Sequence, residues 1–168
     1  MEPDMFGIEL NSLDDTIEFG RMLGKAALRH GIRAICMTGG LGSGKTTLTN
    51  ALVRSLPGSE NAEPASPSFS ICNRYPTIPP VVHCDLYRCG RNIPDEVLDA
   101  LDEPSCLTII EWAEFLPALA KPKDTLDIIL KTCDKKRLLE LNGDDIRVSA
   151  LIADLRRGPL TGLSRQIV

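Results

Sequence analysis

Gly39-Gly40-Leu41-Gly42-Ser43-Gly44-Lys45-Thr46 decides the fold of this chain, because it fits the pattern G-x-x-x-x-G-K-[ST] of a phosphate-binding loop. An apolar segment, residues 34–37, leads into the loop, and residues 47–53 follow it at helical spacing. The order strand, loop, helix is the context in which this motif binds phosphate. The stretch therefore predicts a strand and a helix that are joined by a nucleotide-binding loop.

The residue types of the loop suit the chemistry of a bound triphosphate. Glycines let successive backbone N–H groups turn toward phosphate oxygens, where a Cβ would block the approach. The following helix presents its free N–H groups and the positive end of its dipole to the same anion. Lys45 can neutralise charge on the β- and γ-phosphates, and the Thr46 hydroxyl can bind Mg²⁺. The candidate nucleotide-binding residues of this stretch are Gly40, Leu41, Gly42, Ser43, Gly44, Lys45, Thr46 and Thr47.

Composition indicates an ordinary globular protein. The chain has 168 residues, of which 43% are hydrophobic and 25% charged, so we expect residues 1–168 to form a single P-loop ATPase domain. A net charge of −4 argues against a surface that grips nucleic acid unaided. No apolar run approaches the ~20 residues of a membrane span, and the acidic stretch at residues 1–4 does not resemble a secretory signal. We therefore expect a cytoplasmic protein without a membrane partner.

The hydrophobic pattern predicts the fold class. Apolar runs at residues 34–37, 69–75, 81–85 and 107–112 are typical of buried strands, with helical segments between them. Alternation over residues 126–141 predicts an antiparallel hairpin. The expected architecture is α/β with the P-loop NTPase fold, a single three-layer domain with a mixed sheet, in which a parallel core is joined by antiparallel C-terminal strands. We expect a last short helix at residues 149–156 and a loose tail from Gly158.

A long helix is predicted before the first of these strands, from Ser12 as N-cap to Gly31 as the stop signal. Gly20 and Gly24 lower its intrinsic stability, so we expect close packing against a neighbouring element to compensate. The residues expected on the buried face are Leu13, Ile17, Gly20, Gly24, Ala27 and Leu28.

The six cysteines do not form a C-x-x-C pair, and several of them lie in apolar, strand-like runs. Buried free thiols are the expectation for such positions, in preference to metal ligation.

Two acids are candidates for the chemistry that a phosphate-binding loop cannot supply alone. Asp85 and Glu111 each end an apolar run, and ligands of open α/β sheets bind at the carboxyl ends of strands. Spacing does not settle which acid contacts Mg²⁺. We favour Glu111 for the metal and Asp85 for orienting water, which with Lys45 makes three candidate catalytic residues.

Several further residues permit two interpretations. Ser66 and Ser68 lie on a loop after the phosphate-loop helix, where switch segments sense a γ-phosphate, but an ordinary surface loop fits equally well. His83 is interpreted as a structural strand residue. Trp112 follows Glu111 and should therefore point to the opposite face, into the core. Residues 135–137 are interpreted as a solvated hairpin end.

Four motifs together resemble one family. GGLGSGKTT at 39–47, SPSF at 66–69, HCDLYR at 83–88 and IEWAE at 110–114 are similar, in this order, to the TsaE (YjeE) ATPases. That family acts in bacterial biosynthesis of threonylcarbamoyladenosine on tRNA. The resemblance runs from about residue 8 to residue 150.

The resemblance implies a compact, weakly active ATPase that uses ATP and Mg²⁺ and acts with TsaB-like and TsaD-like subunits. It implies that Thr46 and Glu111 hold the metal and that Asp85 is needed for activity. The loop of Ser66 to Ser68 corresponds to the family's switch. Thr16 corresponds to a position where the N-terminal helix approaches the nucleotide.

The chain departs from the family pattern at three places. Gly40 replaces the usual aspartate, Ala65-Ser66-Pro67-Ser68 replaces a Thr-Ser-Pro-Thr run, and Ala113 replaces a common proline. None of these changes removes a candidate phosphate or metal ligand. They do affect the expected details of switch closure.

The predicted function is that of an ATP-hydrolysing accessory protein of the tRNA N6-threonylcarbamoyladenosine modification complex. Its Mg-ATP cycle would reset the partner carbamoyltransferase, with tRNA contacted only indirectly. A P-loop small-molecule kinase is the first alternative, for which Arg88 and Arg91 would supply cations, and a nucleotide-binding module without hydrolysis is the second. A GTPase is disfavoured, because the sequence has no N-K-x-D motif.

Overall fold

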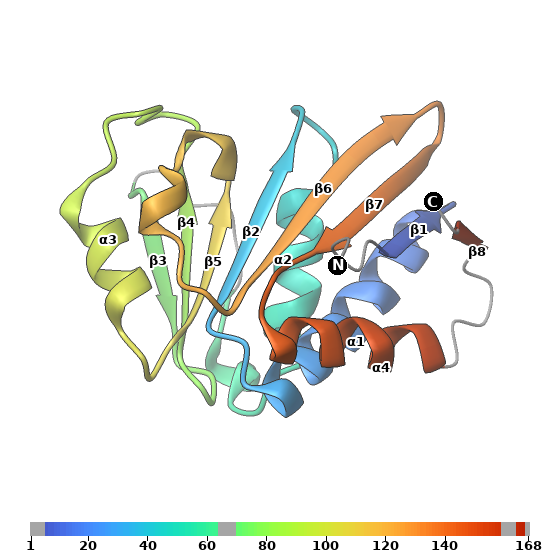
Figure 1. Ribbon diagram of the computed structural model, residues 1–168, viewed down its shortest axis with the longest axis horizontal. Coiled ribbons are helices and arrows are strands. Elements are labelled where there is room, and N and C mark those ends of the chain that lie inside the picture. The colour runs from blue at the N-terminus through green and yellow to red at the C-terminus, as the bar shows by residue number, and fades with distance from the viewer. Residues whose placement is uncertain (1–5, 64–69, 159–163, 167–168) are drawn as a thin grey trace.

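A computed structural model describes residues 6–63, 70–158 and 164–166 of the chain. Its strands form one sheet in the order β3-β4-β5-β2-β6-β7-β1-β8 (Figure 1). Strands β4, β5, β2 and β6 run parallel to one another, and each remaining strand pairs antiparallel with its neighbour. The strand bounds are β1 Phe6–Leu10, β2 Ala34–Gly39, β3 Cys72–Tyr75, β4 Val81–Asp85, β5 Leu107–Glu111, β6 Thr125–Cys133, β7 Lys136–Asn142 and β8 Ser164–Gln166.

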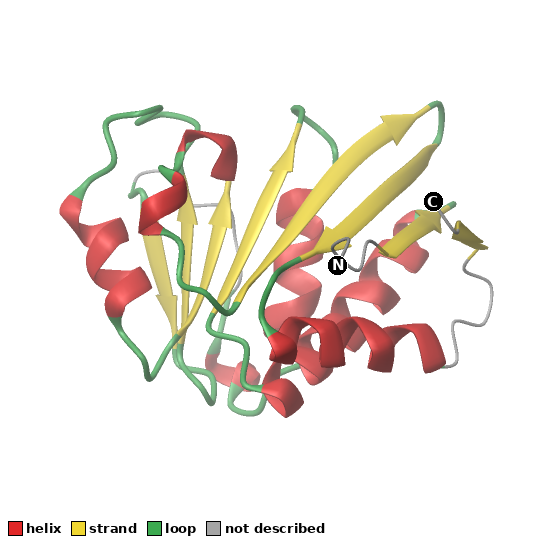
Figure 2. Cartoon of the chain, in the orientation of Figure 1, coloured by secondary structure: helices red, strands yellow, loops and turns green. Residues whose placement is uncertain are grey.

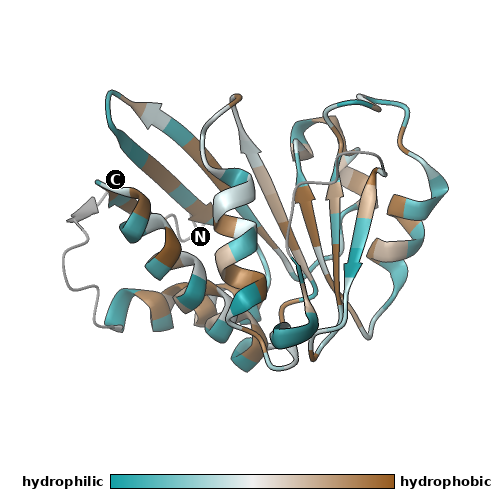
Figure 3. Ribbon diagram, turned by 180° about the vertical axis from the view of Figure 1, so that it is seen from behind, coloured by the Kyte–Doolittle hydropathy of each residue, from teal (hydrophilic) through white to brown (hydrophobic). Residues whose placement is uncertain are grey.

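Helices cover both faces of the sheet, which gives the three layers that the sequence predicts (Figure 2). One hydrophobic core lies between the sheet and three helices, α1 (Leu13–His30), α2 (Lys45–Arg54) and α4 (Ile146–Arg157). A second core lies on the other face beneath α3 (Asp95–Asp102). The central strands are hydrophobic along much of their length (Figure 3), as expected for parallel strands that are buried on both faces. Short 3₁₀ turns occupy Ser59–Asn61, Ala113–Phe115 and Ala118–Ala120.

The sheet is larger than the sequence analysis predicts. β1 forms from the N-terminal segment and pairs with β7, and β8 pairs with β1 in turn. The prediction of a loose tail is therefore wrong for residues 164–166, which add an antiparallel strand at the sheet edge. The expected hairpin is β6–β7, but β6 also pairs in parallel with β2 and so belongs to the parallel core. The last helix begins three residues earlier than expected, because the Asp145 side chain caps it.

Helix α1 confirms the predicted caps and the predicted close packing. The Ser12 side chain accepts a hydrogen bond from the Asp15 N–H, and Gly31 ends the helix in the left-handed conformation. A Cβ added at Gly20 would lie 2.6 Å from the Cβ of Ala51 on α2. The predicted buried face is wrong for Leu13 and Leu28, which are 63% and 42% exposed. The true face includes Phe19 and Leu23, so the apolar stripe is rotated relative to the prediction.

The expectation of free thiols is wrong for one pair of cysteines. Cys72 on β3 and Cys84 on β4 are direct partners across the antiparallel pair, and a disulfide joins them. The spacing of Cys72 and Cys84 in the sequence does not predict that they are paired across β3 and β4. Cys36 and Cys106 are buried free thiols, as expected, and burial raises the pKa of Cys36 to about 12. Among the helices of the described residues, we find none with the length and hydropathy needed to cross a bilayer.

Candidate functional site

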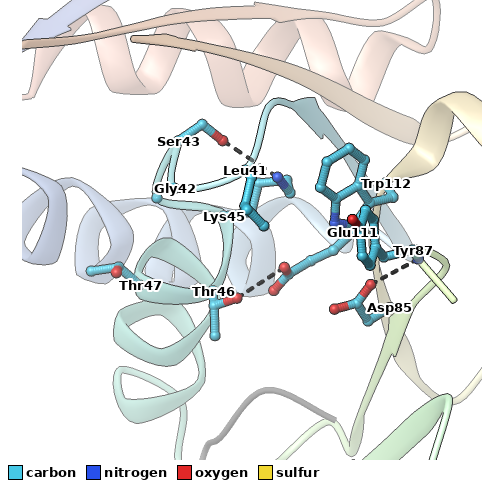
Figure 4. Close-up of a pocket in the computed structure, with 11 residues that line it drawn as sticks. Leu41, Gly42, Ser43, Lys45, Thr46, Thr47, Asp85, Tyr87, Glu111 and Trp112 are labelled. Carbon is cyan, nitrogen blue, oxygen red and sulfur yellow. Dashed lines mark hydrogen bonds between the residues drawn. The ribbon is translucent and has the colours of Figure 1, made fainter. Parts of the chain in front are cut away.

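The phosphate-binding loop connects β2 to α2 at the carboxyl end of the parallel strands. β2 ends at Gly39, and α2 begins at Lys45. Gly44 precedes the helix at φ 103°, a backbone conformation that residues with a Cβ rarely adopt. Beside the loop lies a pocket of about 280 Å³ (Figure 4). Its lining comes from the loop and from the ends of β4 and β5, and consists of Leu41, Gly42, Ser43, Gly44, Lys45, Thr46, Thr47, Asp85, Tyr87, Glu111 and Trp112.

Lys45 is folded back onto its own loop. Its Nζ donates hydrogen bonds to the carbonyl oxygens of Gly39 at 2.7 Å and Gly40 at 2.9 Å. Burial lowers the pKa of Lys45 from its ordinary value, while the nearby carboxylates of Glu111, Glu114 and Asp85 act in the opposite direction. The lysine is thus a largely buried cation beside the pocket, held by neutral carbonyl groups that an anion can replace.

Trp112 packs against the second core, as predicted, but it also lines the pocket, which the sequence analysis does not predict. Strand β5 ends at Glu111, and Trp112 follows it at φ 58°, so the alternation of strand side chains stops one residue earlier than assumed. The Nζ of Lys45 lies 4.1 Å from the centroid of the Trp112 ring. The ring of Tyr87 packs against Trp112 at a centroid distance of 4.8 Å. A cation–π contact and an aromatic pair therefore form one wall of the site.

Glu111 is the most enclosed acid of the site, with a side chain that is 2% exposed. Its Oε2 accepts a hydrogen bond from the Thr46 hydroxyl at 2.9 Å. Its Oε1 lies 2.8 Å from Nε2 of His83 and 3.4 Å from Oγ1 of Thr49. The structure therefore brings both candidate metal ligands, Thr46 and Glu111, into direct contact.

These two residues fit a magnesium ion that is shared with phosphates. Mg²⁺ prefers oxygen ligands and is usually held by one or two protein groups together with water and substrate phosphates. Thr46 supplies a hydroxyl oxygen and Glu111 a carboxylate, and their oxygens are close enough to bind one ion. No cluster of three or more His, Cys, Asp or Glu side chains that would hold a metal by itself occurs within residues 6–63, 70–158 and 164–166.

Asp85 lies beside Glu111 at the same edge of the sheet. The two residues are register partners across the parallel pair β4–β5. The Oδ1 of Asp85 accepts a hydrogen bond from the Tyr87 N–H at 2.9 Å, which fixes the turn after β4 (Figure 4). Asp85 is less buried than Glu111 and leaves its other oxygen for the pocket. This arrangement suits an acid that acts on water or on a hydrated ligand.

Thr16 lies on the other side of the loop. It lines a second hollow, of about 180 Å³, which shares Gly42, Gly44 and Thr47 with the loop. The hairpin β6–β7 reaches this hollow, where a guanidinium nitrogen of Arg137 lies 3.4 Å from the Gly42 carbonyl oxygen. Thr16 therefore does lie near the phosphate-binding loop. Lys135 and Lys136 are exposed, as interpreted, whereas Arg137 is half-buried and contacts the loop.

The remaining predicted site residues do not line the pocket or are not described by the structure. Ser66 and Ser68 lie outside the described residues. Gly40 does not line the pocket, and a Cβ added there would meet nothing within 4 Å, so the aspartate that is usual in the family would have room. Arg88 and Arg91 are exposed and do not line the pocket.

Four residues of the site were missed or placed elsewhere by the sequence analysis, namely His83, Tyr87, Trp112 and Arg137. A signal for His83 was available, because it lies two residues before Asp85 and must share its face of the strand. Arg137 had no such signal, since its position depends on the length and twist of the hairpin.

Comparisons with known proteins point to one family. The family model "Threonylcarbamoyl adenosine biosynthesis protein TsaE" matches residues 10–139. A tRNA threonylcarbamoyladenosine biosynthesis protein TsaE from Nostoc sp. is 31% identical over 159 residues, covering 89% of this chain and 93% of the relative. The protein of the same name from Aquifex aeolicus is 34% identical over 107 residues, covering 62% of this chain and 74% of the relative.

A solved structure is similar in fold. The crystal structure of Bacillus subtilis YdiB superposes with a TM-score of 0.69 at 20% sequence identity, covering 94% of this chain and 97% of the other. At this identity the likeness concerns the fold alone. The predicted P-loop NTPase fold with a mixed sheet is confirmed.

Proposed function

Because the chain belongs to the TsaE family of threonylcarbamoyl adenosine biosynthesis proteins, we propose that it binds ATP with Mg²⁺ and hydrolyses it as an accessory protein of tRNA modification. The observation that carries the proposal is the 2.9 Å hydrogen bond between Thr46 and Glu111, which joins the phosphate-binding loop to the end of β5. A loop threonine and a strand-end acid in contact form the donor set of a Mg-nucleotide site.

The roles of the chain's own residues follow from their positions. Backbone N–H groups of the loop and of the first turn of α2 bind the phosphates. Lys45 leaves the carbonyl groups of Gly39 and Gly40 and neutralises the β- and γ-phosphates. Thr46 and Glu111 would hold Mg²⁺, which would supply charge neutralisation at the phosphates. Asp85 orients the attacking water from the adjacent strand.

The partners proposed are TsaB-like and TsaD-like subunits, which contact the tRNA, in the cytoplasm. In this proposal the ATP-bound and ADP-bound forms of the chain differ in affinity for that pair, so that hydrolysis resets it between modification cycles. Family membership supports the pathway. The net charge of −4 is consistent with a subunit that leaves tRNA contact to others.

Phosphate release from ATP by the purified chain tests the hydrolase activity. We expect slow release that requires Mg²⁺ and no added acceptor, and a loss of at least ~100-fold in the variant Glu111→Gln, which keeps the shape of the side chain and removes its charge. Transfer of phosphate only when a small-molecule acceptor is added would identify a kinase instead. Binding of ATP without any release would identify a nucleotide-binding module.

The biological role needs a second assay. TsaB-like and TsaD-like subunits, tRNA and threonylcarbamoyl-adenylate are combined with and without the chain. We expect several rounds of tRNA modification per complex only when the chain and ATP are both present. Equal turnover without the chain would contradict the accessory role even if ATP is hydrolysed.

A further inference from the structure

The carboxylate of Glu111 is held by groups from two different elements. Thr46 and Thr49 approach it from α2, at 2.9 Å and 3.4 Å, and His83 approaches it from β4 at 2.8 Å. The two oxygens are divided between these neighbours. Oε2 faces Thr46, whereas Oε1 faces His83 and Thr49. Only Oε2 therefore lies on the side of the proposed magnesium ligand Thr46.

The position of His83 follows from strand register. His83 and Asp85 lie on one face of β4, and their partners on β5 are Ile109 and Glu111. A side chain of imidazole length at position 83 therefore extends along the sheet toward the Glu111 carboxylate. The ring of Tyr75 from β3 lies 6.3 Å from the His83 ring, between centroids. With no exposed surface, the His83 side chain is closely enclosed.

The hydrogen bonds of His83 define its tautomer. Nδ1 is buried and has no hydrogen-bond partner among the residues that the structure describes. A proton on Nδ1 would leave a buried N–H group unpaired, which costs about 1–3 kcal/mol. A proton on Nε2 is instead donated to Oε1 of Glu111. The ring therefore acts as a fixed donor to this carboxylate.

We propose that His83 is a positioning residue for the magnesium site. This inference rests on the proposed function, which supplies the magnesium site. By holding Oε1, His83 fixes the orientation of the Glu111 carboxylate so that Oε2 faces Thr46 and the nucleotide pocket. If the Thr46 hydroxyl turned to a metal ion, its hydrogen bond to Glu111 would be lost. The donor from β4 then keeps the carboxylate in place, as second-layer hydrogen bonds do in metal sites generally.

Magnesium-dependent nucleotide binding tests this role without relying on turnover. The affinity for a fluorescent ADP analogue is measured in Mg²⁺ and in EDTA for the wild type, His83→Leu, His83→Gln and Glu111→Gln. Leucine fills the space without a donor, whereas glutamine can place an amide N–H near the position of Nε2. His30→Gln is the matched control, because His30 is the other histidine of the chain and contacts Asp154 instead.

We expect His83→Leu to lose about 10–100-fold of the Mg²⁺-dependent gain in affinity and to bind as the wild type does in EDTA. His83→Gln should recover most of that gain, and His30→Gln should not differ from the wild type. In the Glu111→Gln background, His83→Leu should cost little more, since both changes act on the same contact. Additive losses, or a full gain in His83→Leu, would overturn the role of His83.

Two further outcomes separate the inference from the proposed function. A wild-type chain with equal ADP affinity in Mg²⁺ and EDTA would contradict the magnesium site itself.

If the leucine variant does not fold, ¹⁵N spectra of the wild-type imidazoles test the tautomer of His83 instead. The assignment is simple, because the chain has only two histidines. A proton on Nε2 of His83 is expected, and a proton on Nδ1 would overturn the proposal.

Discussion

At the scale of single residues, Lys45 is held both by its own loop and by an aromatic ring. Its ammonium group donates to two carbonyl groups of the loop and lies against the only tryptophan of the chain. Phosphate oxygens are stronger acceptors for an ammonium group than carbonyl oxygens are, because the resulting hydrogen bonds are between charged groups. Binding of a nucleotide should therefore move Lys45 away from the Trp112 ring.

Tryptophan fluorescence should report this movement directly. We expect a saturable change in emission when ADP or ATP is added to the wild type. Lys45→Met should change the emission before any nucleotide is added and should lower nucleotide affinity about 10–100-fold, from the loss of charge-assisted hydrogen bonds of about 1.5–3 kcal/mol. Lys25→Met, at an exposed position of α1, is the control and should leave the titration unchanged. An unaltered response in Lys45→Met would contradict the proposed contact.

The residues that a local motif specifies were predictable, and those that depend on tertiary register were not. The glycine-rich pattern locates Lys45 and Thr46 at the start of α2, because their positions depend on the loop alone. Glu111 and Asp85 were predictable because the ends of parallel strands meet at one edge of the sheet. Trp112 was predicted only in part. It packs against the second core as expected, but its contact with Lys45 depends on a left-handed backbone conformation that cannot be predicted for tryptophan from the sequence.

At the scale of elements, the packing of α1 on α2 depends on two glycines. A Cβ at Gly20 would lie 2.6 Å from the Ala51 Cβ and 2.9 Å from the Leu48 carbonyl oxygen, and one at Gly24 would lie 2.8 Å from the Leu52 carbonyl oxygen. Backbone atoms of α2 cannot move aside without shifting the helix. The helix that carries Lys45 and Thr46 is therefore positioned partly by the absence of side chains on its neighbour.

Gly20→Ala should destabilise the protein despite the better helix propensity of alanine. Overpacking costs about 1–3 kcal/mol and is offset by a propensity gain of about 1 kcal/mol. We therefore expect a net loss of up to about 2 kcal/mol in the free energy of unfolding. Urea denaturation measures this loss. The added change Ala51→Gly removes one of the two close contacts and should restore part of the loss. A variant Gly20→Ala at least as stable as the wild type would contradict this close packing.

A second contact between elements makes a prediction about acid. Arg74 on β3 donates to Glu103 at the end of α3 at 2.8 Å, and this hydrogen bond, with contributions from Cys106 and Ser105, lowers the pKa of Glu103 from 4.5 to about 2. A lowered carboxyl pKa stabilises the folded state above the unfolded value, and that contribution is lost as the pH falls from 4.5 toward 2. Because both side chains are substantially exposed, the effect should be small.

Thermal unfolding between pH 6 and pH 2 tests this contact. The wild type should have a slightly higher Tm than Glu103→Gln above pH 5, and the difference should shrink as the pH falls. Arg74→Gln should show the same loss, because it removes the other partner. A difference that persists unchanged at pH 2 would mean that Glu103 contributes through packing rather than through its charge.

At the scale of the whole molecule, the sequence predicted the parallel core better than the edges. Strands β2, β4 and β5 are continuous apolar runs because helices bury both of their faces. Strand β1 was missed because it is a short segment of five residues next to the chain end, and β8 because three residues cannot show a period. Strand β1 depends on the edge that β7 offers, and β8 depends in turn on the edge of β1. Such pairing is decided by tertiary contacts and not by local pattern.

The continuity of this sheet leads to a prediction about the unfolding of the whole chain. The proposed nucleotide pocket takes its lining from the phosphate-binding loop, α2 and the ends of β4 and β5. The sheet that carries these elements has a hydrophobic core on each face. If residues 1–168 unfold as one unit, a ligand bound at the pocket stabilises every element together. At a free concentration of 100 times Kd the stabilisation is about 2.7 kcal/mol, and a domain of this size gains about 2–4 °C per kcal/mol.

Calorimetry should therefore show a single transition that Mg-ADP shifts as a whole, by about 5–11 °C at that concentration. The Lys45→Met variant at the same ADP concentration should shift much less, because its affinity is lower and the occupied fraction falls. Two transitions, of which only one responds to nucleotide, would contradict a single domain. They would mean that the antiparallel part of the sheet, β7, β1 and β8, unfolds independently of the strands that carry the site.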